Sequence, residues 1–143
     1  MLINKTNLKF QKYKTDVPII KFSLSDGSSF DAIVDTGSES TVIDKCFVKK
    51  HNKLFHTTSE SKMSLIGITG DSPHIVEHIS STFFFEGRRC MVSGVTSDLT
   101  ELNDNIHSYC DNDINVSVII GCDMLNQLGA IIDFNSHSIK IKL

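Results

Sequence analysis

The sequence of 143 residues contains no tryptophan, only two prolines and no long apolar run. A membrane-spanning helix needs about 20 consecutive apolar residues, so no segment qualifies. The first residues, Met1 to Thr6, lack the apolar region of a secretory signal, and we therefore expect a cytoplasmic protein. A formal net charge of −3 provides no general attraction to nucleic acid or to an anionic membrane. We expect neither of these as a partner.

Cysteine is sparse as well, and no two cysteines form a Cys-x-x-Cys pair. Wide spacing favours reduced thiols over a disulfide framework. The four residues concerned are Cys46, Cys90, Cys110 and Cys122.

A metal site has little support in the sequence. His74 and His78 have the spacing of two ligands on a helix, but Pro73 and the β-branched neighbours favour a strand. Residues four apart on a strand share a face but lie about 13 Å apart. We therefore expect no metal and no cofactor.

Short apolar segments separated by turn signals dominate the chain, whose length is typical of a single domain. This pattern predicts a small all-β barrel or sandwich. Asp26-Gly27 predicts a hairpin turn, and Asp44 is expected to cap a short helix over 45–50. Strands are expected over 17–24, 29–34, 41–43, 62–66, 75–85, 89–95, 130–134 and 138–143, a second helix after Gly121, and a polar loop over 99–115.

The most informative segment is Ala32-Ile33-Val34-Asp35-Thr36-Gly37-Ser38. Its apolar run predicts a buried strand, and Gly37 predicts a tight turn directly after it. Asp35 is therefore expected at a sharp strand end, where backbone amides and hydroxyls of the loop hydrogen-bond its carboxylate.

A second signal begins at Val118-Ile119-Ile120-Gly121 and continues through Cys122-Asp123-Met124-Leu125-Asn126-Gln127-Leu128-Gly129. It predicts a strand, a helix of about two turns opened by Cys122 or Asp123, and a stop at Gly129. With Asp-Thr-Gly-Ser before it, this motif resembles the retropepsins, the retroviral-type aspartic proteases. The resemblance covers residues 17–143 and implies a closed all-β barrel with one short C-terminal helix, whereas residues 1–16 form an N-terminal extension of unknown role.

Aspartic proteases hydrolyse peptides with two carboxylates, one acting as a base toward water and the other as an acid toward the carbonyl oxygen. In the aspartic proteases, the two carboxylates of such a pair share one proton. Asp-Thr-Gly occurs once in this chain, so the pair can form only across a twofold axis. The sequence therefore predicts a homodimeric endopeptidase with Asp35 and its symmetry mate at the centre.

The resemblance also implies roles for the neighbours of Asp35. Thr36 is expected to be buried beside the twofold axis, and Gly37 to offer its carbonyl to a substrate amide. Ser38 is expected to hydrogen-bond near the carboxylate. Glu39 adjoins the substrate and departs from the family, where an aspartate here commonly pairs with an arginine after Ile-Ile-Gly; Cys122 stands in that second position.

Further substrate-binding residues follow from the same resemblance. Gly67-Ile68-Thr69-Gly70 resembles the flap, a hairpin that closes over bound peptide and excludes water. Ser117 and Ile119 fall where the family lines its side-chain pockets. The bound peptide is expected to be extended and bonded through its backbone like an added strand.

Two alternatives stay open at the level of sequence. The chain is either an enzyme or a catalytically silent dimeric scaffold that binds peptides with the same fold. It is either a stand-alone protein or a domain released from the polyprotein of a virus or retroelement, in which case its location includes the virion.

Overall fold

The computed structural model describes residues 5–9, 18–63, 74–85, 87–109 and 114–142. Strands predominate among them, as the sequence predicts. The strands are β1 (Lys5–Lys9), β2 (Ile19–Ser23), β3 (Ser29–Val34), β4 (Val42–Asp44), β5 (His56–Met63), β6 (His74–Phe85), β7 (Arg88–Ser97), β8 (Val116–Ile120), β9 (Ile131–Asp133) and β10 (Ser138–Lys142). The helices are α1 (Lys45–Lys50), a 3-10 turn (Asn52–Leu54), α2 (Thr100–Tyr109) and α3 (Cys122–Gln127).

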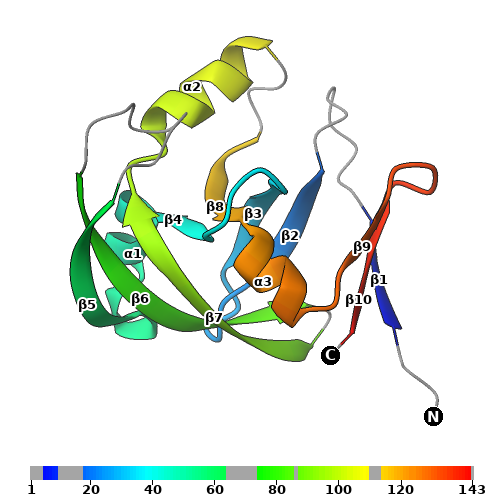
Figure 1. The fold of residues 1–143 in the computed structure, drawn as a ribbon, viewed down its shortest axis with the longest axis horizontal. Coiled ribbons are helices and arrows are strands. Elements are labelled where there is room, and N and C mark those ends of the chain that lie inside the picture. Colours follow the sequence, from blue (N-terminus) through cyan, green and yellow to red (C-terminus); the bar gives the residue numbers. More distant parts are fainter. Residues whose placement is uncertain (1–4, 10–17, 64–73, 86, 110–113, 143) are drawn as a thin grey trace.

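Six strands close into a barrel in the order β2-β3-β8-β4-β7-β6, and β5 extends the sheet beyond β6 (Figure 1). The pairing of Ser23 on β2 with Phe84 on β6 closes the ring. Most neighbours are antiparallel, but β3 runs parallel to β8 and β4 parallel to β7. The predicted closed barrel is confirmed.

A separate sheet of three strands lies beside the barrel, in the order β1-β10-β9 (Figure 1). Lys5 on β1 pairs with Lys142 on β10, so segments from the two ends of the chain are neighbours. The residues placed in the N-terminal extension therefore contribute a strand to the fold. The division at residue 16 itself stays a prediction.

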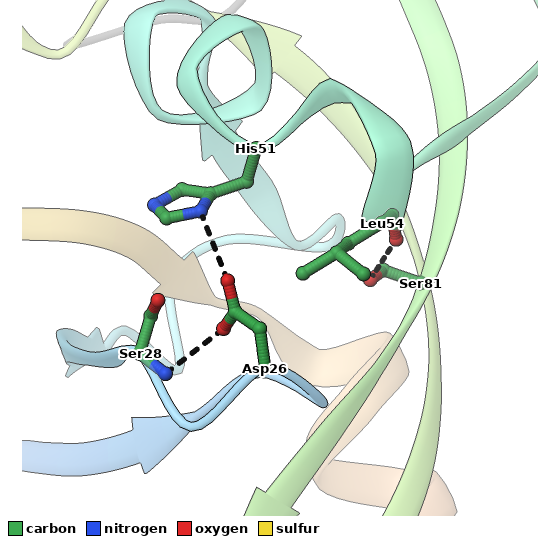
Figure 2. A network of polar contacts seen from close by, with 5 residues as sticks. All are labelled: Asp26, Ser28, His51, Leu54 and Ser81. Atoms are coloured by element: carbon green, nitrogen blue, oxygen red, sulfur yellow. Dashed lines mark hydrogen bonds and ion pairs between the residues drawn. The ribbon is translucent and has the colours of Figure 1, made fainter.

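Local sequence explains the first hairpin and the helix that follows. Gly27 has a φ of 87°, and Asp26 accepts a hydrogen bond of 2.9 Å from the Ser28 backbone (Figure 2). Hydrogen bonds from Ser28, with a smaller contribution from His51 at 3.8 Å, lower the pKa of Asp26. Asp44 caps α1 as predicted, because its carboxylate accepts from the Phe47 amide.

The barrel core is rich in phenylalanine. Phe83 and Phe85 are fully buried, whereas Phe84 between them is half-buried, as alternation along β6 requires. The ring centroids of Phe22 and Phe85 lie 4.1 Å apart. On the barrel wall, the Ser81 hydroxyl donates to the Leu54 carbonyl at 2.6 Å and ties the 3-10 turn to β6 (Figure 2).

The prediction of a polar loop over 99–115 is wrong, because residues 100–109 form α2. Asp98 starts this helix by accepting from both the amide and the hydroxyl of Thr100. Leu99, Leu102 and Ile106 supply a helical apolar stripe, but polar residues separate them and weaken the pattern. In the part of the chain that the structure describes, neither α2 nor any other helix is long and apolar enough to cross a membrane.

Candidate active site

Asp35 directly follows the last residue of β3, and its exposed side chain precedes a turn at Thr36 and Gly37. Its amide donates to the Ile120 carbonyl at 3.0 Å, which extends the pairing of β3 with β8 by one residue. The Gly37 amide donates to Asp35 Oδ1 at 2.9 Å, and the Ser38 amide donates to the Asp35 carbonyl at 3.2 Å. The turn therefore holds the carboxylate at the surface through the Gly37 amide, whereas the Ser38 hydroxyl, which was expected near the carboxylate, bonds the Ser40 carbonyl instead.

Gly121 brings the second motif against this loop. A Cβ added at Gly121 would lie 2.5 Å from the Ser40 carbonyl oxygen and 2.8 Å from that of Ser38. Next to it, the Cys122 amide donates to the Ser38 carbonyl at 2.7 Å, and the Asp123 amide donates to the Glu39 carbonyl at 3.1 Å. The first turn of α3 thus anchors the backbone that follows Asp35.

Thr41 and Asp123 reinforce the anchor, and the sequence did not single out Thr41. The Thr41 hydroxyl donates to Asp123 Oδ1 at 2.7 Å, and its amide donates to Oδ2 at 3.1 Å. The same hydroxyl accepts from the Gly121 amide at 3.2 Å. A threonine that begins an apolar strand just after an Asp-Thr-Gly loop is the only sequence signal that points to it.

The residues that follow Asp35 differ in exposure and in their hydrogen-bond partners. Thr36 and Glu39 are exposed in the single chain, so any burial of Thr36 requires a partner. The Ser38 hydroxyl donates to the Ser40 carbonyl at 2.7 Å and stiffens the loop. The Cys122 thiol donates to the Thr36 carbonyl at 3.1 Å.

Ile119 and Ser117 occupy different environments on β8. Ile119 is buried beside Ile33, its register partner on β3, in an apolar cluster that also contains Val42. Ser117 lies farther from Asp35 along the strand, where it lines a cavity of about 480 Å³ with charged residues that include Lys21 and Asp31. The structure therefore places Ile119 near the Asp35 end of the barrel and Ser117 in a polar region next to it.

The predicted flap residues Gly67 and Ile68 lie outside the described residues. The strands on either side of them, β5 and β6, pair antiparallel up to Met63 and His74.

Two further observations concern metals and thiols. Among the described residues, no three His, Cys, Asp or Glu side chains gather closely enough to hold a metal ion. The described cysteines Cys46, Cys90 and Cys122 are free, and burial raises the pKa of the Cys90 thiol.

Comparison with known proteins gives a match in structure only. No family model and no curated protein matches the sequence. The retroviral protease-like domain of Ddi1 from Leishmania major matches over 90% of this chain and 90% of its own, with a TM-score of 0.57 and 13% identity. A retropepsin-like aspartic protease from Rickettsia conorii matches over 98% of this chain and 91% of its own, with a TM-score of 0.55 and 13% identity. The chain has the retropepsin fold, and the resemblance inferred from the two motifs is confirmed at that level.

Proposed function

We propose that this chain is an aspartic endopeptidase that acts as a homodimer. The observation that carries the proposal is the exposed carboxylate of Asp35, held by the Gly37 amide at the end of β3 within the retropepsin fold. Thr36, Gly37 and Ser38 support this carboxylate through the loop. Gly37 also presents its carbonyl to the substrate backbone, and Glu39 adjoins the substrate.

The proposed reaction uses one Asp35 carboxylate from each protomer. The ionised carboxylate removes a proton from water while the water oxygen forms a bond to the scissile carbonyl carbon. The protonated carboxyl group gives its proton to the carbonyl oxygen, which leaves a neutral tetrahedral diol. The carboxyl group that received the water proton then gives it to the amide nitrogen. The other carboxylate takes a proton from one hydroxyl of the diol as the C–N bond breaks, so that the pair of carboxyl groups again holds one proton.

A second copy of the chain is required because each chain contains one Asp-Thr-Gly loop. β10 lies between β1 and β9, so within the described residues the edges of the small sheet are β1 and β9. The side chains at and just beyond β9 are exposed and apolar, with exposed fractions of 47% for Ile131 and 60% for Phe134. An exposed apolar sheet edge favours pairing with another strand, and this one suits an isologous contact.

The proposed substrate is a peptide or a polyprotein segment in extended conformation. The predicted flap, the segment that contains Gly67 and Ile68, would cover the peptide from one side, and the Asp35 loops would contact it from the other. Backbone hydrogen bonds would hold the chain, and alternate side chains would enter pockets near Ile119 and Ser117.

Substitution of Asp35 by Asn tests the assignment. We expect hydrolysis of a diverse peptide pool, followed by mass spectrometry, to fall at least ~10³-fold, because losses of about 10⁴- to 10⁶-fold accompany removal of other essential catalytic residues. Asp26→Asn, in the β2–β3 turn, is the matched control and should retain activity. Cleavage by the Asp35→Asn variant at the wild-type rate would refute the proposal. Peptide binding without turnover by the wild-type protein would identify a silent scaffold instead.

The dimer is tested by dilution. The rate per chain should fall below the dimer dissociation constant, and sedimentation over the same concentrations should show the change in mass. Ile131→Glu should shift both transitions to higher concentration, whereas Met91→Glu, at another exposed apolar residue on β7, should shift neither. A fully active monomer would rule out the shared pair.

The pH profile is expected to be bell-shaped, since the pair must hold one proton. Lower pH protonates the base, and higher pH removes the acid. A hydroxyl-containing statine inhibitor should bind between the carboxyl groups and inhibit, whereas chelators should have no effect. Activity abolished by a chelator and restored by zinc would contradict this mechanism.

A further inference from the structure

The outer face of the barrel is apolar next to Asp35. Along β3, Ala32 and Val34 point into the barrel core, so Ile33 points outward. Ile33 pairs with Ile19 on β2 and with Ile119 on β8, which places three isoleucines in one row across three strands. Because Ile33 precedes Asp35 by two residues, this row lies roughly 7 Å along the strand from the proposed catalytic residue.

Helix α2 packs against the apolar cluster that contains two of these isoleucines, Ile19 and Ile119. Ile19 and Ile119 are buried in an apolar cluster with Leu99, the residue just before the helix. Leu102 and Ile106, one turn apart on α2, pack against the same cluster but remain half-buried, as does Ile33. In Figure 1 the helix lies over the end of the barrel where β8 begins. Leu102 and Ile106 on α2 and Ile33 on β3 therefore border the same apolar cluster and remain partly exposed, and Ile33 is the one of the three that lies next to Asp35 along β3.

The helix is fixed to the barrel by polar contacts at both ends. The buried Asn103 side chain accepts from the Val116 amide at 2.7 Å and donates to the Val116 carbonyl at 2.9 Å, as a neighbouring strand would. His107 Nε2 lies 2.6 Å from the Ile114 carbonyl oxygen, and the Leu99 amide donates to Asp44 at 3.0 Å. These contacts make α2 a fixed wall, and its apolar side chains are positioned before any ligand binds.

We propose that Leu102 and Ile106 determine substrate specificity by forming the outer wall of the side-chain pocket next to Asp35. This inference rests on the proposed endopeptidase function. The pocket accepts an apolar side chain of moderate size, because Ile33 and Ile119 form its floor and contribute no polar group. A charged side chain would lose its hydration there without gaining a partner, and an aromatic ring would meet Ile106.

Cleavage of the peptide pool first identifies the substrate position at which the wild-type enzyme most strongly prefers apolar residues. The experiment then compares two peptides that differ only in having valine or phenylalanine at that position. Ile106→Ala should raise the Phe-to-Val ratio of kcat/KM at least about tenfold, since one or a few methylene groups in a pocket discriminate by roughly 10- to 200-fold. Ile106→Val, a milder change that protects against loss of folding, should shift the ratio in the same direction by less. Asp104→Ala, on the exposed face of the same helix, should leave it unchanged.

The outcomes separate the two proposals. Cleavage with an unchanged ratio in folded Ile106→Ala would overturn the role of α2 and leave the endopeptidase assignment intact. If the wild-type protein cleaves no peptide, the endopeptidase assignment fails. The role of α2 is then tested by fluorescence anisotropy on a labelled pair of pool peptides that differ only in valine or phenylalanine and are selected by binding: altered Phe-to-Val binding selectivity in Ile106→Ala supports the wall, and unaltered selectivity or no binding refutes it.

Discussion

Replacing Gly121 by alanine tests how the structure positions its candidate active site. The added Cβ would lie 2.5 Å from the Ser40 carbonyl oxygen, 2.6 Å from the Ser40 carbonyl carbon and 2.8 Å from the Ser38 carbonyl oxygen. All three atoms belong to the backbone of the loop that follows Asp35, so no side-chain rotation relieves the contact. Ordinary van der Waals contact begins at 3.4 Å, and the two segments must therefore separate by roughly 1 Å.

Two effects follow from this displacement. Overpacking of this kind costs about 1–3 kcal/mol of folding free energy, and the Cys122 hydrogen bond to the Ser38 carbonyl lengthens with it. A shift of about 1 Å in a catalytic group lowers the rate by roughly 10²-fold. We therefore expect Gly121→Ala to lower both the free energy of unfolding in urea and kcat/KM per folded dimer.

A control separates stability from positioning. Ile20→Val removes one buried methyl group from β2 and should cost about 0.5–1.5 kcal/mol while leaving the Asp35 loop in place. Its kcat/KM per folded dimer should equal that of the wild-type enzyme. If Gly121→Ala unfolds at the wild-type urea concentration and retains full activity, the close backbone contact does not position the loop, and the reasoning is refuted.

Other predictions concern α2 and the thiols. Asn103→Ala leaves the amide and carbonyl of Val116 without their side-chain partner, so the free energy of unfolding should fall by about 2–6 kcal/mol, at 1–3 kcal/mol for each buried group; an unchanged urea midpoint would contradict this. Hydrogen bonds from Thr100 lower the pKa of Asp98 below its unfolded value of about 3.9. Their stabilisation is therefore present above that pH and is lost as the pH falls through the lowered pKa, so Asp98→Asn should weaken the acid dependence of the melting temperature below about pH 4. Iodoacetamide at neutral pH should modify exposed Cys46 before buried Cys90, whose pKa is raised, and mass spectrometry of the native protein showing the reverse order would contradict the structure.

Much of the fold is predictable because local signals agree with the tertiary structure. The Asp26-Gly27 turn, the Asp44 cap of α1 and the stop at Gly129, whose φ is 55°, depend on backbone conformations that these residue types prefer. Helix α2 was missed because its stability comes from burial of a sparse apolar stripe and from the Asn103 contacts with β8. Neither is a local property of residues 100–109.

The same distinction applies to the candidate site. Two short motifs suffice to predict an aspartate at a strand end and a strand–glycine–helix unit, because turn and helix-end chemistry acts between residues close in sequence. The prediction of the retropepsin fold rests on the resemblance of these motifs to that family. The closure of β2 on β6, the contact of Gly121 with Ser38 and Ser40, and the bond from Thr41 to Asp123 join residues far apart in the chain. Only tertiary structure decides such contacts, because packing in three dimensions determines which backbone atoms approach and which polar groups remain to be paired.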